Sequence, residues 1–321
     1  MIWLTWRQHR KQALFAVIGL AVLAALMIPT GLAMRYSFDH LGLPDCLRSM
    51  GQGEFVSANT PNACISAFQQ FNTQYRTLGT VGELLIFLPL LVGLFWGAPM
   101  VAREIEQGTH RLVWTQGVSR LHWAVVKFGL IGAASLTAAV IYGLGMSWWL
   151  TPLSQTANSR LSLLSFDVQG VAPIGYTLFA VALGYFAGVV WRKVLPAMAA
   201  TFVGFLALRI AVTALARPHY LPPITLTFPV EGVTPQMNPA LGDWIQAMDV
   251  RDATGKVIMD NAQVGCAPHS PLCNFGAGAY NWVLYQPGSR FWLFQGIETV
   301  IFVALAALLL YLAIRQIRRI A

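Results

Sequence analysis

Six apolar runs, each of about 20 residues, constrain this chain more than any other feature of its sequence. An α-helix rises 1.5 Å per residue, so about 20 apolar residues cross the roughly 30 Å hydrocarbon layer of a bilayer. The runs are 13–34, 79–101, 124–150, 172–191, 195–215 and 291–314. With 56% hydrophobic and only 11% charged residues, the chain lies far outside the composition of a soluble domain. We therefore expect an all-α membrane protein with six transmembrane helices.

The first run resembles a secretory signal peptide, because basic residues precede it and small residues follow it. A cleaved signal peptide, however, has an apolar core of only about 7–15 residues. The longer run predicts an uncleaved helix. Before it, Trp3 and Trp6 stand beside basic residues and favour a short helix at 1–12 that lies in the membrane interface. The alternative is a charged flank that only anchors the first span.

The distribution of Lys and Arg predicts the orientation of the chain in the membrane. These residues are denser in the short connections than in the long ones, and by the positive-inside rule the short connections face the cytoplasm. Both termini then face the cytoplasm. The protein is expected in the cell (plasma) membrane. The outer segments are 35–78, 151–171 and 216–290, and the inner ones are 102–123, 192–194 and the tail 315–321. This bias accounts for the net charge of +8 without a nucleic-acid partner.

All four cysteines fall in outer segments, where an oxidising environment allows disulfides to persist. Cys46 and Cys64 belong to the first outer segment, and Cys266 and Cys273 to the last. Pairing within each segment is the simplest arrangement, although four cysteines allow three connectivities. A zinc site is the rival interpretation for 266–273, but the tight CxxC spacing typical of zinc ligands is missing. We expect no metal.

The sequence contains no familiar catalytic motif. HExxH and GxSxG are missing, and the Gly255-Lys256 pair is followed by Val257, where a Walker A loop needs Ser or Thr to hold magnesium. We therefore expect no enzyme activity and no cofactor in this chain. If the protein uses ATP hydrolysis, we expect a separate subunit to carry it out. An intramembrane enzyme is disfavoured on the same ground.

Two charged residues interrupt the last two apolar runs at similar depths. Arg209 lies seven residues from the outer end of its run, and Glu298 seven residues from the outer end of the last run, so both lie about 10 Å below the outer surface. An unpaired charge there is costly. We predict that the two residues pair and brace the bundle, with Glu83 as a rival partner and substrate binding as the alternative role. Reversing both charges together should then restore what a single reversal destroys.

The segment "AREIEQGTHRLVWTQGVSR" at 102–120 is charged and broken by turn residues, although it lies between two spans. Gly108 is expected to end the second transmembrane helix, and Thr109 to cap a short helix that Gly117 ends. Ser119 can then cap the third span. The pattern predicts a helix of about two turns on the cytoplasmic side.

This short helix carries both apolar and charged side chains. Leu112 and Trp114 give the helix an apolar surface, and Arg111 gives it a charge. Glu104 and Glu106 add charges in the turn that precedes it. An amphipathic knob of this kind suits the groove of a partner protein. The alternative is a solvated loop that only follows the positive-inside rule, but Trp114 would be poorly placed in water.

Four stretches of the sequence resemble the actinobacterial permeases of the ABC-2 type, the membrane subunits of ATP-binding cassette exporters. They are 102–127, "LTWRQHR" at 4–10, "RPHYLPP" at 217–223 and "YQPGSRFWLFQGIETVIF" at 285–302. The resemblance implies six helices per subunit, an interfacial helix before the first, and a coupling helix between helices two and three. By the same resemblance, the contacts with the ATPase involve Glu104, Glu106, Gly108, Thr109, Arg111, Leu112 and Trp114, with a second contact at Arg192 and Lys193.

The resemblance also implies the function. We expect a permease that dimerises, as a homodimer or a heterodimer, and exports an amphipathic or hydrophobic drug, antibiotic, peptide or lipid. Two copies of a separate ATPase subunit would bind ATP and Mg²⁺. The segment 216–290 is longer than in compact family members. A sensory or immunity protein that binds a ligand through its outer loops is the alternative.

Overall fold

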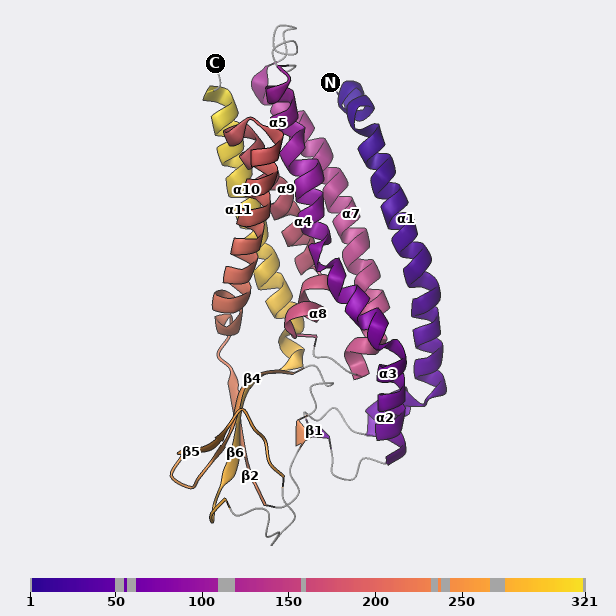
Figure 1. Cartoon of the computed structure of the whole chain (residues 1–321), viewed down its shortest axis with the longest axis vertical. Helices are drawn as coiled ribbons and strands as arrows, with labels where there is room; N and C mark the ends of the chain where they lie inside the picture. Colours follow the sequence, from indigo (N-terminus) through magenta and orange to yellow (C-terminus); the bar gives the residue numbers. More distant parts are fainter. Residues whose placement is uncertain are drawn as a thin grey trace.

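The computed structural model describes residues 2–49, 55–56, 62–108, 119–156, 160–231, 236–237, 243–265 and 275–319. Figure 1 shows a tall bundle of helices with a β-sheet at one end and both chain termini at the other. We call these the sheet end and the terminal end. Within the described ranges, six helical stretches are long and apolar enough to cross a membrane: Ala13–His40, Ala63–Glu106, Leu121–Thr156, Ala172–Trp191, Val194–His219 and Gly288–Arg319.

The first two spans are longer than their apolar runs. They consist of α1 (Ile2–His40), α2 (Leu43–Ser49), α3 (Asn62–Leu84), the 3-10 turn η1 (Leu85–Phe87), α4 (Leu88–Val92), the π-helical turn η2 (Gly93–Gly97) and α5 (Ala98–Glu106). Pro89 and Pro99 lack the N–H that a regular helix needs. The 3-10 and π turns next to them keep this path helical despite the missing donors.

Two expectations for this half of the chain were wrong. No separate interfacial helix ends near residue 12, because α1 runs unbroken through residues 2–40, and no Gly or Pro occurs before Gly19 to stop it. The expected outer loop at 35–78 is largely helical, because α3 begins at Asn62 and buries Phe71 and Tyr75 against α1. Apolar run length therefore understates helix length where polar turns continue a packed face.

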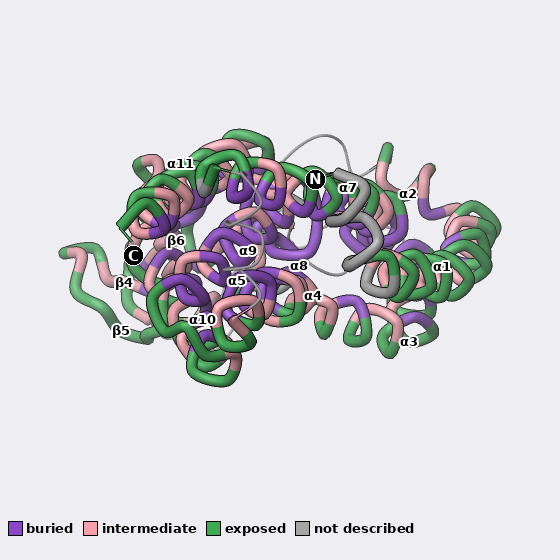
Figure 2. Tube along the Cα trace, turned by 90° about the horizontal axis from the view of Figure 1, so that it is seen from above, coloured by how far each residue is buried: buried purple, intermediate pink, exposed green. Residues whose placement is uncertain are grey.

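The second half of the bundle is built around one central helix. Its elements are α7 (Arg120–Thr156), α8 (Leu163–Val168), α9 (Ala172–Trp191), α10 (Val194–Ala211), the π turn η3 (Val212–Ala216), the 3-10 turn η4 (Arg217–His219), the 3-10 turn η6 (Gly288–Arg290) and α11 (Phe291–Arg319). Helix α9 contacts α5, α7, α10 and α11 and is mostly buried, whereas α1 lies at the periphery and is mostly exposed (Figure 2).

Glycines allow the second and fourth spans to touch backbone to backbone. A Cβ atom added at Gly93 would lie 2.7 Å from the carbonyl carbon of Ala180, and one added at Gly184 would lie 2.5 Å from the nitrogen of Ala98. Such distances are too short for any side chain, so glycine is required on both sides. This is the close approach that small-xxx-small spacing produces in membrane helices.

The expectation of an all-α protein was wrong in one respect: the chain is mostly helical, but it also contains a β-sheet. The antiparallel sheet has the order β2-β6-β4-β5, and a second pairing joins β1 to β3. The strands are β1 (Phe55–Val56), β2 (Ile224–Pro229), β3 (Gln236–Met237), β4 (Trp244–Arg251), β5 (Val257–Asp260) and β6 (Tyr280–Gln286). The alternating residues Asn281, Val283 and Tyr285 of β6 are buried, as a one-sided sheet requires. Strands β4 and β5 pair antiparallel and form a hairpin, in which Asp249 faces Asp260.

The disulfide predicted in the first outer segment is confirmed. Cys46 of α2 and Cys64 of α3 are bonded, with their Cα atoms 5.7 Å apart. The bond links α2 to the start of α3 and thereby restricts the chain between the two helices. Cys266 and Cys273 lie outside the described residues.

Candidate functional site

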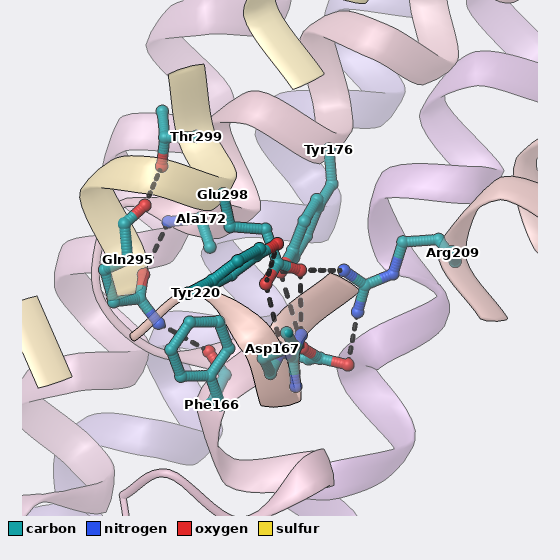
Figure 3. A network of polar contacts seen from close by, with 10 residues as sticks. Phe166, Asp167, Ala172, Tyr176, Arg209, Tyr220, Gln295, Glu298 and Thr299 are labelled. Carbon is teal, nitrogen blue, oxygen red and sulfur yellow. Dashed lines mark hydrogen bonds and ion pairs between the residues drawn. The ribbon is translucent and has the colours of Figure 1, made fainter. Parts of the chain in front are cut away.

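Glu298 of α11 lies at the centre of a buried cluster of charged side chains near the sheet end of the bundle (Figure 3). Its side chain is 0% exposed. Arg217 donates hydrogen bonds from Nε to Oε2 at 2.9 Å and from Nη2 to Oε1 at 2.8 Å. The hydroxyl of Tyr176 donates to Oε1 at 2.6 Å, and that of Tyr220 to Oε2 at 3.3 Å. The carboxylate is thus held on both oxygens.

Asp167 and Arg209 complete the cluster. Arg209 forms an ion pair with Asp167, and its Nη1 lies 3.2 Å from Oε1 of Glu298. Nη2 of Arg217 lies 2.6 Å from Oδ1 of Asp167. The guanidinium of Arg209 also stacks over the ring of Tyr176 at 3.6 Å, a favourable cation–π arrangement. Two positive and two negative groups therefore neutralise one another away from solvent.

A π turn brings the two arginines to the same face of their helix. Arg209 and Arg217 are eight residues apart, which in a straight α-helix would rotate them about 80° from each other. The π turn η3 between them takes up one extra residue. The two side chains then lie about two turns apart on one face, where both reach Asp167 and Glu298.

Gln295 of α11 fixes the short connection that carries Asp167. Its Nε2 donates to the carbonyl oxygen of Phe166 at 2.7 Å, and its Oε1 accepts from the N–H of Ala172 at 2.7 Å. The turn between α8 and α9 is thereby attached to α11, one turn away from Glu298. The cluster joins five elements, α8, α9, α10, η4 and α11, which come from three separate parts of the chain.

The structure places the expected partners Arg209 and Glu298 in direct contact, and it places Glu83 elsewhere, on α3. Sequence reasoning missed Asp167 and Arg217, because both were assigned to outer loops. The available signal was weak: Arg217 follows the fifth apolar run directly, at a spacing that only the π turn converts into a shared face. Asp167 lies in α8, and nothing in the sequence after the third run indicated that this short helix packs against the bundle.

At the terminal end, the acidic residues that were expected to face a partner also make contacts within the chain. Glu104 of α5 forms an ion pair with Lys127 of α7, and both side chains are largely buried. The Lys127 ammonium lies 5.0 Å from the ring centre of Trp123. Glu104 therefore joins the second and third spans.

Glu106 joins the second span to the fifth. Its Oε2 accepts the backbone N–H of Val194, the first residue of α10, at 2.9 Å. A carboxylate at a helix N-terminus satisfies an otherwise unpaired donor and interacts favourably with the helix dipole. Arg192 ends α9 in the left-handed conformation, with φ of 56°, and Arg192 and Lys193 are both exposed. The turn at 192–193 is thereby held beside the end of α5.

Both ends of the connection between α5 and α7 have the expected local structure. Gly108 has a φ of 69° beyond the last turn of α5, and the hydroxyl of Ser119 accepts the N–H of His122 at 3.2 Å as an N-cap of α7. The other residues predicted to contact an ATPase here lie outside the described residues: Thr109, Arg111, Leu112 and Trp114. In the part of the chain that the structure describes, no group of His, Cys, Asp or Glu has the arrangement of a metal site.

Six membrane-length helices with buried charges at one end define a polytopic α-helical membrane protein. The family model described as "ABC-2 membrane transporter related" matches residues 17–217, well over half of the chain. The chain belongs to this family, and it is a multi-pass protein of the plasma membrane and an ABC-2 type permease. Permeases of this kind in general work with an ABC ATPase. No curated protein and no solved structure matches the chain.

Proposed function

We propose that this chain is the membrane subunit of an ABC exporter, in which two permeases and two copies of a separate ATPase couple ATP hydrolysis to export. The main observation in support is the hydrogen bond between Glu106 and Val194. It holds the last turn of α5, after which the first expected ATPase contact begins, beside the turn at 192–193, which is the second expected contact. They can form one docking surface, with Arg192 and Lys193 exposed on it.

In this proposal the terminal end is cytoplasmic, and the ATPase subunits carry the ATP and Mg²⁺ while this chain does not catalyse hydrolysis. Closure of the ATPase pair would push on both segments together. Glu104 and Glu106 would transmit the movement to α7 and α10, because these carboxylates join α5 to those helices. The exposed apolar side of α1 suits lipid or the second permease chain, as a homodimer or a heterodimer.

The docking surface can be tested by purification together with the ATPase in mild detergent. We expect Trp114→Ala to lower the recovery of the ATPase at least about tenfold, because buried aromatic anchors at interfaces often contribute 2 kcal/mol or more. Glu106→Ala should retain docking but lower transport per ATP hydrolysed, since it frees the start of α10.

Trp292→Ala is the matched control for the tryptophan variant. Trp292 is 60% exposed at the other end of the bundle, so its loss should leave the recovery of the ATPase unchanged. Equal recovery with Trp114→Ala and with the parent chain would contradict the assignment of this segment as the docking element. Full coupling in Glu106→Ala would contradict the transmission step.

A sensory or immunity function remains the second candidate, favoured by one feature of the sheet. Strand β5 is an edge strand, and its residues Val257, Ile258 and Met259 are each about 40% exposed. An edge of this kind can add a strand from an extended ligand. Ligand binding to the sheet without net movement of cargo in proteoliposomes would favour this candidate over export.

A further inference from the structure

A cavity of about 500 Å³ lies between α3, α7 and the segment 165–169 at the end of α8. Its size is that of a small-molecule site. The charge cluster around Glu298 does not line it. Its lining is part polar and part apolar, and it includes Glu83, an acid of the second span that does not belong to the cluster.

Two buried polar side chains line this cavity and have no partner within the described chain. Gln169 is 4% exposed and Ser165 is 7% exposed, and neither side chain makes a hydrogen bond to the described residues. Neither side chain has a polar atom that is fully enclosed without a partner, so their unpaired polar atoms border the cavity and can be satisfied from it. Their position on the cavity wall indicates a ligand with polar atoms.

The cavity also has one charge of each sign. Arg76 and Glu83 lie seven residues apart on α3, which places them on one face of the helix and about 10 Å apart along its axis. Among the described residues, neither side chain has an ion-pair or hydrogen-bond partner. Arg76 lies in the middle of α3 and is exposed, whereas Glu83 lies next to its last residue and is half-buried.

The apolar part of the lining reaches from the level between Arg76 and Glu83 to the level of Glu83. Cδ2 of Leu150 lies 3.2 Å from the position of a Cβ at Gly82, and Cδ1 of Leu153 lies 3.9 Å from that at Gly79. The outer part is polar: Asn72 donates a hydrogen bond to the carbonyl oxygen of Thr156 at 3.0 Å. Leu150 and Glu83 thus lie deepest, Leu153 lies between the two charges, and Arg76 lies farther out with the amides.

We propose that this cavity binds an amphiphile whose amine lies between its apolar part and its anionic group. Glu83 pairs with the ammonium, Arg76 pairs with the carboxylate or other anion beyond it, and Gln169 supplies a hydrogen bond. The reverse order of charges, as in phosphoethanolamine lipids, would bring the anion to Glu83. The assignment deepens the proposed export function by giving the chemistry of the cargo, and as a transport step it rests on that function.

The test is calorimetric titration of the full chain in lipid nanodiscs, without ATPase or ATP, with empty nanodiscs subtracted. The probes are N-dodecyl-4-aminobutanoate, with the amine next to the chain, and dodecylphosphoethanolamine, with the phosphate next to the chain. We expect the first to bind at least about tenfold more tightly. Glu83→Gln should remove most of that preference, since a charge-assisted contact contributes about 1.5–3 kcal/mol, or about tenfold or more.

Arg76→Gln should weaken binding less, by about threefold, because the exposed guanidinium is screened by water. Gln169→Leu removes the buried amide without altering charge and should also weaken the aminobutanoate probe. Glu231→Gln, an exposed carboxylate in the sheet region, should change nothing. Equal affinity for the two probes, or parent-like affinity in both Glu83→Gln and Gln169→Leu, would overturn the proposal. Because ATPase recovery is measured separately, a failure here is distinguishable from a failure of the exporter assignment.

Discussion

Glu298→Gln is expected to destabilise the protein by about 3–5 kcal/mol, the usual cost of removing one partner from a buried ion pair. The substitution leaves Arg209 and Arg217 facing Asp167 alone, so one positive charge stays buried without compensation. The amide also cannot accept all the hydrogen bonds that the carboxylate accepts from Arg217, Tyr176 and Tyr220. Thermal unfolding of the purified chain in detergent measures the effect as a large fall in the midpoint.

The matched variants separate charge from packing. Arg209→Gln combined with Glu298→Gln keeps the cluster neutral and should recover part of the loss, whereas Glu231→Gln should melt as the parent chain does. The charge reversal of Arg209 and Glu298, expected from the sequence to restore stability, should fail. It would place a guanidinium at 298 against Arg217 and a carboxylate at 209 against Asp167. A parent-like midpoint in Glu298→Gln would show that the cluster does not stabilise the fold.

Gly184→Ala is also expected to destabilise the protein, although it adds a single methyl group. The new Cβ would lie 2.5 Å from the nitrogen of Ala98 and 2.7 Å from the carbonyl carbon of Gly97. Both are backbone atoms, so relief requires α9 to separate from η2 and α5. Overpacking a tight contact costs about 1–3 kcal/mol or more, and here the movement would propagate along two spans. Reduced folded yield and a lower unfolding midpoint are the measurements.

Gly129→Ala is the control for this substitution. Gly129 is exposed on α7, and no atom lies within 4 Å of its added Cβ. Alanine is favoured over glycine inside a helix by about 1 kcal/mol, so this variant should be neutral or slightly more stable. If both variants unfolded at the same temperature, the close contact between the second and fourth spans would not limit stability.

The six spans were predictable because a bilayer imposes a local rule on the sequence. Any segment that crosses it must be apolar over a fixed length and must satisfy its own backbone hydrogen bonds. The ends of the helices were less predictable. Helices α1 and α3 continue beyond the apolar runs because residues such as Phe71 and Tyr75 pack against neighbouring spans, and that packing is not visible in hydropathy.

The charge pair was predictable only in part. Arg209 and Glu298 stood out because each is isolated in an apolar run at a matching depth. Asp167 and Arg217 did not, since ordinary polar segments also contain such residues. Their role depends on the π turn η3 and on the return of α8 to the bundle, and both are decided by contacts with distant residues.

The sequence by itself determined the membrane class and the number and order of the spans, because these follow from composition and spacing along one helix. The tertiary structure alone decided that Arg217 and Asp167 neutralise the buried pair, that Glu104 and Glu106 join α5 to other spans, and that Glu83 lines a cavity. Each of these depends on which residues from separate helices face one another. That is set by the packing of the whole bundle and leaves no local pattern in the chain.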